Sequence, residues 1–250
     1  MNREVLGPED GPTVVMLHGW GASIDLLRPL GERLAPLGYR VVMFDLPGFG
    51  QTPPPSTPWN VFDYAQHVAA ELDALGIQKA HVFGHSFGGR LSLILGADYP
   101  GRVGKLVLSD AAGIRAPLPL MIRARTGGYK GLRRGLEAVG LRGLSERLRA
   151  AYNARYGSSD FNAASGVMRE TFVKVVNQDL RDWAKRVAAP TLLFWGSADE
   201  DTPLEQGREL ESLIPDAGLV VFEGAGHYAY LERAADTARI IHRFLSDEEK

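Results

Sequence analysis

Residues 80–89 read AHVFGHSFGG, a short apolar run followed at once by a glycine-rich turn with a serine at its centre. The pattern Gly84-x-Ser86-x-Gly88, after a strand and before a helix, predicts a tight strand–turn–helix elbow. Such a turn strains Ser86 and exposes its hydroxyl, and glycine at 84 and 88 lets the backbones approach each other. The helix N-terminus behind Ser86 adds a partial positive charge where a negative oxygen would develop. We therefore predict that Ser86 is a catalytic nucleophile.

Outward from this elbow, short apolar runs alternate with stretches of helical period. The runs are β-branched and continuous, as in strands covered on both faces, and their alternation with helices favours a parallel sheet with right-handed crossovers. The expected strands are 13–17, 40–44, 80–83, 105–108, 191–195 and 219–222, with 3–6 as an antiparallel edge strand. The expected helices are 25–37, 61–75, 86–99, 204–214 and 234–245. The predicted fold class is α/β, with a mostly parallel sheet flanked by helices.

The alternation stops at Ile114 and resumes after Val187. Between them the sequence is helical in pattern and rich in Arg, Leu and Gly, with 172–176 as its one strand-like run. It carries 15 basic and 6 acidic residues, a net charge of +9, whereas the rest of the chain carries 13 basic and 24 acidic residues, a net charge of −11. We interpret 114–187 as a helical cap inserted into a core formed by 1–113 and 188–250.

A serine nucleophile needs a base that is oriented by a third group. Of the six histidines, His227 lies in the small-residue segment EGAGH just beyond the last apolar run. The carboxyl edge of a parallel sheet is where catalytic groups collect, so His227 is the predicted base. Asp199, in GSAD after the run 191–195, is the predicted acid, with Asp201 and Asp110 as alternatives. The order Ser, Asp, His agrees with this interpretation.

The segment HGWG at 18–21 directly follows the run 13–17. Its glycines let a backbone N–H turn toward the nucleophile, so the amides of Trp20 and Phe87 are the predicted oxyanion hole.

Taken together, the motifs HGWG, FDLPGFG (44–50), GHSFGG, GSAD with Pro203, and GAGH resemble the α/β-hydrolase superfamily in order and spacing along nearly the whole chain. The resemblance implies a triad of Ser86, Asp199 and His227 and identifies 114–187 as the family's cap. One feature departs from the family's pattern: the short N-terminus leaves room for one strand before the HGWG strand, so we expect a sheet of about seven strands rather than eight.

A serine at the elbow disfavours the relatives that use aspartate there, the haloalkane dehalogenases and epoxide hydrolases. The main prediction is a carboxylesterase-like enzyme that cleaves an ester, thioester or lactone of a small to medium acyl or aryl substrate through an acyl-enzyme. The alternative is a carbon–carbon bond hydrolase of the same fold. A non-catalytic binding protein of this fold is disfavoured, because all three triad candidates are present. The sequence implies no cofactor and no metal.

The substrate pocket is predicted to include Trp20, His85, Met121 and Tyr129. Other apolar or aromatic side chains of the cap are further candidate walls, although packing within a helical lid is the favoured role for most of them: Leu118, Leu120, Ile122, Tyr152, Tyr156 and Phe172. The partner is expected to be a small molecule, and the basic cap suggests an anionic substrate or an acidic carrier protein; the alternative is that its arginines are solvated or pair with the acidic body. Nucleic acid is disfavoured, because the basic residues interleave with leucines and no recognised module accompanies them.

The chain has no cysteine, which excludes disulfides, a cysteine nucleophile and thiolate metal sites. The N-terminus Met1-Asn2-Arg3-Glu4 lacks the charged and apolar regions of an export signal, and no apolar run approaches about 18 residues. We therefore expect a soluble, cytoplasmic protein without stable membrane insertion.

Overall fold

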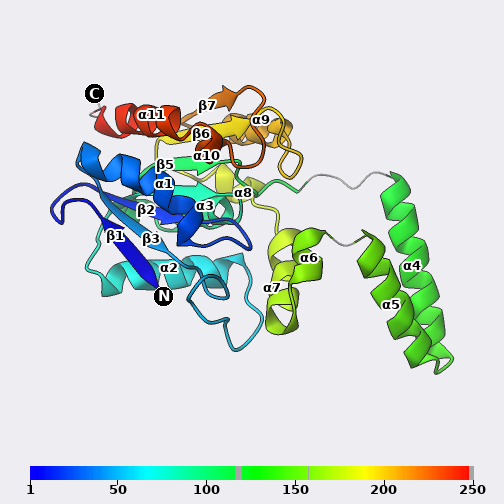
Figure 1. The fold of residues 1–250 in the computed structure, drawn as a ribbon. Helices are drawn as coiled ribbons and strands as arrows, with labels where there is room; N and C mark the ends of the chain where they lie inside the picture. The colour runs from blue at the N-terminus through cyan, green and yellow to red at the C-terminus, as the bar shows by residue number, and fades with distance from the viewer. Residues whose placement is uncertain (116–119, 157, 248–250) are drawn as a thin grey trace.

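The computed structural model describes residues 1–115, 120–156 and 158–247 and has a seven-stranded sheet at its centre, in the order β1-β3-β2-β4-β5-β6-β7 (Figure 1). The edge strand β1 is antiparallel to β3, and every other neighbouring pair is parallel. The strands are β1 (Arg3–Leu6), β2 (Thr13–Leu17), β3 (Arg40–Phe44), β4 (Ala80–His85), β5 (Val103–Ser109), β6 (Thr191–Gly196) and β7 (Ala217–Phe222). The predicted fold class and the antiparallel edge strand are confirmed.

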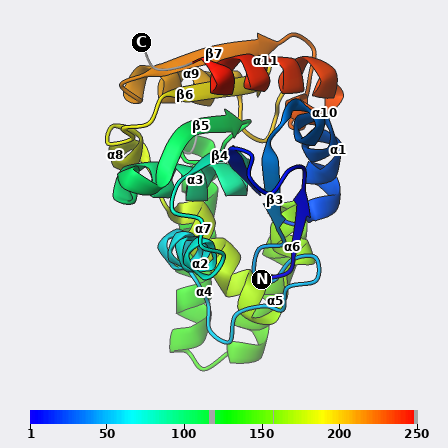
Figure 2. The same cartoon turned by 90° about the vertical axis from the view of Figure 1, so that its left-hand side faces the viewer.

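The continuous apolar runs arise because both faces of the sheet are covered. In β2, Val15 and Leu17 belong to one hydrophobic cluster, whereas Val14 and Met16 belong to another on the opposite face. Successive side chains of a strand point to opposite faces, so a strand buried on both sides needs apolar residues at every position. In Figure 2, the view turned by 90° from that of Figure 1, β7 lies at one edge of this sheet and β3 lies near the other.

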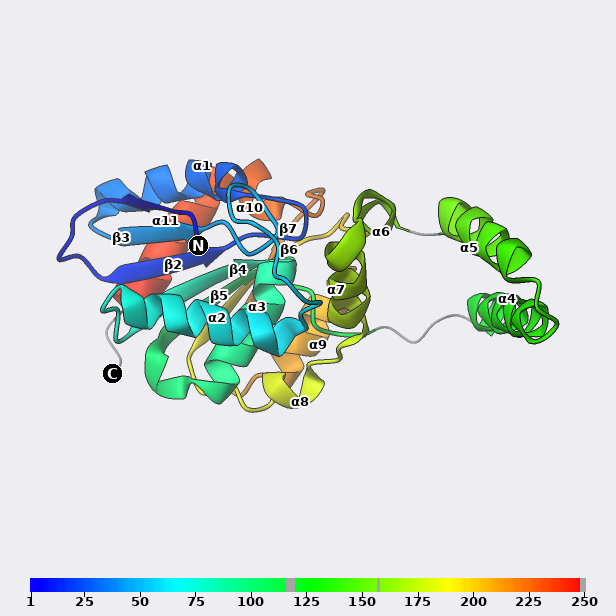
Figure 3. The same ribbon diagram turned by 90° about the horizontal axis from the view of Figure 1, so that it is seen from below.

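Helices form a layer on each face of the sheet (Figure 3). One layer contains α1 (Ile24–Leu34), α10 (Ala229–Glu232) and α11 (Ala234–Ser246), and the other contains α2 (Val61–Ala74), α3 (Phe87–Asp98), α8 (Arg181–Ala184) and α9 (Leu204–Leu213). Short 3₁₀ helices cover Ala35–Leu37 and Pro100–Arg102. The first helix ends at Leu34, earlier than the predicted 25–37. The next three residues, Ala35–Leu37, form a 3₁₀ turn that contains Pro36, and Gly38, with φ 96°, ends this turn.

The segment between β5 and β6 contains α4 (Leu120–Ala138), α5 (Arg142–Tyr156), α6 (Ser159–Ala163) and α7 (Gly166–Asn177), followed by α8. The run 172–176 lies in α7, so its strand-like appearance was misleading. The side chains of Thr171, Phe172 and Val175 are buried, a spacing that a helix places on one face. Figures 1 and 3 show α6 and α7 beside the sheet and its flanking helices, whereas α4 and α5 form a pair that projects away from them.

The strand order reverses at β2. From β2 the chain crosses to β3 on one side, and the next strand, β4, pairs with β2 on the other side. In an open parallel sheet the loops at such a switch point diverge and leave a crevice at the carboxyl ends of the strands. The HGWG loop after β2 and the Ser86 turn after β4 both lie there.

Candidate active site

Ser86 occupies the turn between β4 and α3 with φ 50° and ψ −108°, a conformation that L-residues rarely adopt. A Cβ added at Gly84 would overlap Ser92 Oγ, and one at Gly88 would overlap the carbonyl oxygen of Leu17. Glycine at both positions is therefore required for the close approach of α3 to β4 and β2. Although Ser86 is the N-cap residue of α3, its side chain makes no capping hydrogen bond. Its hydroxyl is thus left for another partner.

That partner is His227, in the loop between β7 and α10. His227 Nε2 lies 3.0 Å from Ser86 Oγ, and His227 Nδ1 lies 2.9 Å from Asp199 Oδ2. The structure therefore joins Ser86, His227 and Asp199 in one hydrogen-bonded chain, although they come from three loops far apart in the sequence. Burial alone would lower the pKa of His227, but the hydrogen bond and the charge of Asp199 raise it above its ordinary value.

Asp199 is buried and held by donors from its own loop. Its Oδ1 accepts hydrogen bonds from the backbone N–H of Asp201 at 2.8 Å and of Thr202 at 2.9 Å. Its Oδ2 accepts a bond of 2.6 Å from Thr202 Oγ1 besides the bond with His227. Burial acts to raise the pKa of Asp199, but the hydrogen bonds from His227 and Thr202 outweigh burial and hold it below its ordinary value. Asp199 therefore stays ionised beside His227.

Thr202 is a site residue that the sequence analysis missed. Its hydroxyl donates to Asp199 and lies 3.3 Å from His227 Nδ1. A single threonine three residues after an aspartate carries no strong sequence signal. The available hint was the position of Thr202 in the loop between the predicted acid and Pro203, which starts the next helix.

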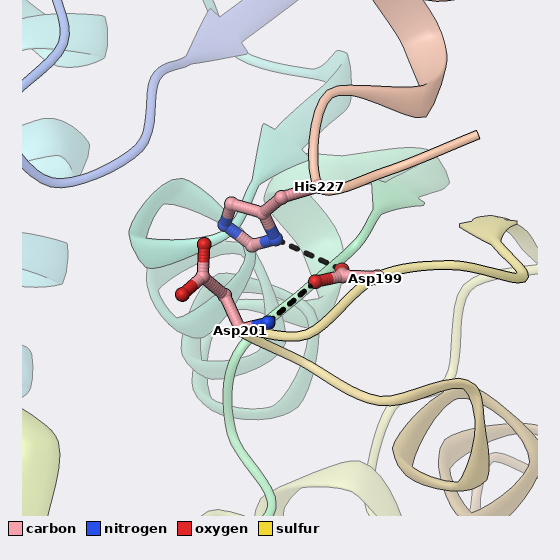
Figure 4. Close-up of side chains that lie close together, drawn as sticks. All are labelled: Asp199, Asp201 and His227. Atoms are coloured by element: carbon pink, nitrogen blue, oxygen red, sulfur yellow. Dashed lines mark hydrogen bonds and ion pairs between the residues drawn. The ribbon is translucent and has the colours of Figure 1, made fainter.

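The two alternative acids occupy different places. Asp201 is exposed, and its backbone rather than its carboxylate contacts Asp199 (Figure 4). Asp110 is fully buried at the end of β5, where its carboxylate accepts hydrogen bonds of 2.8 Å from both Gly196 N and Ser109 Oγ. Burial raises the pKa of Asp110 to about 7. Asp110 thus fixes the start of the Asp199 loop by its hydrogen bond with Gly196 N, whereas Asp199 is hydrogen-bonded to His227.

Asp199, Asp201 and His227 also form the kind of group that could ligate a metal ion, because their ligand atoms lie within 4.8 Å of one another. However, His227 Nδ1 and both oxygens of Asp199 are already engaged in hydrogen bonds, as the dashed lines in Figure 4 indicate. A cation would have to replace those bonds. The arrangement is therefore better suited to holding a proton-accepting histidine than to holding a metal.

The HGWG loop lies against the Ser86 turn. A Cβ added at Gly19 would come within 2.9 Å of His85 Nδ1 and 3.3 Å of Ser86 Cβ, so this loop can approach so closely only without a side chain at that position. His18, the first residue of this loop, is buried, and its Nε2 accepts a hydrogen bond of 3.0 Å from Leu46 N. Burial lowers the pKa of His18 to about 4, so its ring is neutral and ties the HGWG loop to the segment after β3.

A cavity of about 570 Å³ opens beside Ser86, and helices α6 and α7 supply part of its wall. Its lining is mixed, with aromatic, aliphatic, polar and charged side chains: Trp20, His85, Phe87, Arg90, Ile114, Asp160, Phe172, Val175, Val176, Asp201, Thr202, Gln206, His227 and Tyr228 among them. The Trp20 ring makes edge contacts with Phe49, Phe87 and Phe172 at centroid distances of 4.8, 5.4 and 5.0 Å. Trp20 thus connects the HGWG loop to α7.

Of the predicted pocket residues, Trp20 and His85 line this cavity, whereas Met121 and Tyr129 do not. The structure places Met121 on the surface of α4, where it is 83% exposed. Tyr129 stacks on Tyr152 at 3.9 Å and lines a separate hollow between α4, α5, α6 and α7. Of the other candidate wall residues from 114–187, Phe172 lines the cavity with Ser86, and Leu118 lies outside the described residues.

The side chain of His85 is buried and supports the histidine loop. Its Nε2 donates a hydrogen bond of 2.8 Å to the carbonyl oxygen of His227. Burial lowers the pKa of His85 to about 3, so the ring stays neutral. His85 therefore helps to fix the backbone from which His227 reaches Ser86.

Comparison with known proteins places these features in a family. A family model described as alpha/beta hydrolase fold matches residues 12–234. The 2-hydroxy-6-oxononadienedioate/2-hydroxy-6-oxononatrienedioate hydrolase of Cupriavidus pinatubonensis (strain JMP 134 / LMG 1197) is 30% identical over 257 residues, which cover 94% of this chain and 87% of the relative. The 2-hydroxy-6-oxo-6-phenylhexa-2,4-dienoate hydrolase of Burkholderia cepacia is 30% identical over 265 residues, 95% of this chain and 88% of the relative.

Among solved structures, the meta-cleavage product hydrolase from Pseudomonas fluorescens IP01 is similar, with a TM-score of 0.72 and 27% identity over 98% of this chain and 93% of that chain. Within the part of the chain that the structure describes, no helix combines the length and apolar character needed to cross a membrane.

Proposed function

The chain belongs to the α/β-hydrolase fold family, and we propose that it is a serine hydrolase in which Ser86 is the nucleophile, His227 the general base and Asp199 the acid that orients His227. The observation that carries this proposal is the continuous chain of hydrogen bonds from Ser86 Oγ through His227 to Asp199. Hydroxyl, imidazole and carboxylate in this order are the arrangement that activates serine for attack on a carbonyl carbon.

In the proposed reaction, Ser86 Oγ attacks a carbonyl carbon of the substrate while His227 Nε2 accepts the hydroxyl proton. The backbone amides of Trp20 and Phe87, beside Ser86 in the cavity wall, stabilise the resulting oxyanion. The bond to the leaving group breaks, and the proton on His227 passes to that group. A water molecule activated by His227 then hydrolyses the acyl-enzyme, which releases the acid and restores Ser86.

The relatives favour one kind of scissile bond. Their names describe hydrolysis of 2-hydroxy-6-oxo-dienoates, compounds that carry a ketone and carboxylate groups but no ester. Water can divide such a molecule beside the ketone only by breaking a carbon–carbon bond. The relatives therefore support the alternative from the sequence more than its main prediction, and we propose that this chain hydrolyses a carbon–carbon bond next to a ketone. The departing carbon leaves with the bonding electron pair and takes up a proton.

Carboxylic ester hydrolysis is the second candidate. The same three side chains can attack an ester carbonyl, and the cavity offers aromatic and aliphatic walls from Trp20, Phe172 and Val175. An ester provides a better leaving group than a carbon, so a site that cleaves carbon–carbon bonds is expected to accept simple esters more readily than the reverse.

We also propose that the segment 114–187 serves as a cap through its α6 and α7 part. Asp160 of α6 and Phe172, Val175 and Val176 of α7 line the cavity that contains Ser86. These residues are therefore placed to determine which small molecules enter, whereas the fold core supplies the reacting groups.

Turnover of two matched substrate classes tests the proposal. Purified protein is incubated with 2-hydroxy-6-oxo-6-phenylhexa-2,4-dienoate and, separately, with a chain-length series of p-nitrophenyl esters, each with Ser86→Ala as control. We expect the dienoate to be converted to benzoate, with no conversion by Ser86→Ala. Hydrolysis of the esters without the dienoate would favour the second candidate. Failure to hydrolyse either class would contradict the proposed function.

A further inference from the structure

Arg90 is a buried cation in the wall of the cavity that contains Ser86. It lies on α3, four residues after Ser86, and its residue exposure is 7%. Its Nη1 donates a hydrogen bond of 2.8 Å to the carbonyl oxygen of Gln178, in the loop between α7 and α8. The proposed reaction gives this guanidinium no role.

Among the described residues, Arg90 forms no ion pair: no carboxylate oxygen lies within 4.0 Å of any of its guanidinium nitrogens. Asp179 is the acidic residue whose charge interacts with Arg90. However, the Asp179 carboxylate is already paired with Arg181, which also contacts Glu209 at 2.6 Å. Burial lowers the pKa of Arg90 to about 10, so the guanidinium still carries its proton at neutral pH.

A buried charge is costly unless an opposite charge and hydrogen bonds compensate for its lost hydration. Within residues 1–115, 120–156 and 158–247, Arg90 donates to one carbonyl oxygen, that of Gln178, whereas a guanidinium has five N–H donors. A partly desolvated guanidinium binds a carboxylate strongly, often through two parallel hydrogen bonds. The missing counter-charge could therefore be supplied by a ligand in the cavity.

We propose that Arg90 forms an anion-binding subsite that receives a carboxylate group of the substrate. This inference rests on the proposed function in one respect, that the substrate occupies the cavity beside Ser86. If Arg90 binds the substrate carboxylate, the preferred substrate is an anion. The positive charge that attracts this anion then lies on the core helix α3 and not on the basic helices α4 and α5.

The cavity also contains carboxylates, and their place orients the anion. Ligand atoms of Asp201 and His227 lie within 4.8 Å of one another, and Asp160 interacts electrostatically with both, whereas Arg90 contacts the carbonyl oxygen of Gln178. The acidic part of the wall is therefore near His227, and the cationic part is near the Gln178 loop. A substrate carboxylate would be repelled from the first and attracted to the second, so the anionic end should point toward α3.

Binding of an isosteric pair tests the subsite without any reaction. The affinities of hexanoate and hexanamide are measured by calorimetry at pH 8 for the wild type and for Arg90→Gln, Arg90→Lys and Arg186→Gln. Arg186 is the matched control, since this cation is paired with Asp98 on the surface, outside the cavity lining. We expect the wild type and Arg186→Gln to bind hexanoate at least about tenfold more tightly than hexanamide.

In Arg90→Gln, the affinity for hexanoate should fall by about tenfold to a hundredfold while that for hexanamide stays within about twofold, and Arg90→Lys should keep part of the preference. Equal affinities of the wild type for the two ligands would overturn the subsite, whether or not Arg90→Gln folds. Equal weakening of both ligands in Arg90→Gln would assign Arg90 a purely structural role through Gln178, and would also overturn it.

The same data separate this inference from the proposed function. Turnover of dienoates or esters without any Arg90-dependent preference for hexanoate would remove the subsite and leave the hydrolase. An Arg90-dependent preference without turnover of any carbonyl substrate would retain the subsite and remove the hydrolase.

Discussion

The carboxyl edge of the sheet and the α4–α5 pair differ in how they hold polar side chains. At the sheet edge, loops after β4, β6 and β7 converge, and hydrogen bonds fix Ser86, Asp199 and His227 against one another. In α4 and α5, residues 120–156 carry nine basic and two acidic side chains, but Ser145 is the one buried residue of the two helices as described. The ring stacking of Tyr129 on Tyr152 joins these helices to each other. We therefore predict that activity depends on the convergent loops of the sheet edge and not on the charged helices α4 and α5.

Replacing a serine in each region should give the sharpest contrast. We expect Ser86→Ala to lower kcat by roughly 10⁴-fold or more, because no other group can form the acyl-enzyme. Ser145→Ala removes a hydroxyl that donates to Glu137 at 2.9 Å in the α4–α5 pair, and should change kcat/KM by less than about twofold. Steady-state kinetics on one substrate measures both. Comparable losses in the two variants would erase the contrast between the regions.

The two buried carboxylates at neighbouring strand ends allow a second comparison. Asp199→Asn should lower kcat by roughly 10³- to 10⁴-fold, because the amide no longer stabilises a protonated His227 in the correct tautomer. Asp110→Asn disturbs the brace at Gly196 and should cost less than about tenfold. If Asp110→Asn had the larger effect, the acid would have been assigned to the wrong strand.

Leucine truncations compare the packing of the two regions. Leu27 in α1 is fully buried, so Leu27→Ala should lower the free energy of unfolding by about 2–5 kcal/mol. Leu144 in α5 is 51% exposed, and Leu144→Ala should change that free energy by less than about 0.5 kcal/mol. Denaturant unfolding at matched temperature gives both values. A cost for Leu144→Ala as large as that for Leu27→Ala would show that α5 is packed against other parts of the protein in solution.

The pH dependence tests the electrostatics of the sheet edge. Only neutral His227 can accept the Ser86 proton, and the hydrogen bond with Asp199 raises its pKa above the ordinary 6.5. Activity should therefore be present at higher pH and be lost as the pH falls through this raised pKa, by about tenfold per unit below it. In Asp199→Asn the midpoint should move to lower pH, since the anion that stabilises the imidazolium is gone. A midpoint that does not move would contradict the pairing of these residues.

Much of the sheet edge could be predicted from the sequence, because its motifs encode local geometry. The glycines around Ser86 are required by contacts that the structure shows, and the apolar runs marked the strands because both faces are buried. Thr202 and Arg90 escaped notice for a physical reason. Their importance depends on neighbours contributed by other loops and helices, which no local pattern specifies.

The segment 114–187, our proposed cap, was harder to predict in detail. Helical periodicity indicates that Met121 and Tyr129 lie on helices, but it does not say what those helices contact. Both residues were expected in the substrate pocket and lie elsewhere, whereas Phe172, in the misleading strand-like run, lines the cavity. The direction in which a helix pair packs depends on connecting segments and on long-range contacts.

Covalent labelling tests the central claim most directly. The protein is treated with a fluorophosphonate, which reacts with activated serines, and the adduct is located by intact-mass and peptide mass spectrometry. We predict one adduct, on Ser86, which is absent in Ser86→Ala, strongly slowed in His227→Ala and unchanged in Ser145→Ala. Absence of any adduct on the folded protein, or an adduct on another serine that persists in Ser86→Ala, would contradict the assignment of Ser86 as an activated nucleophile.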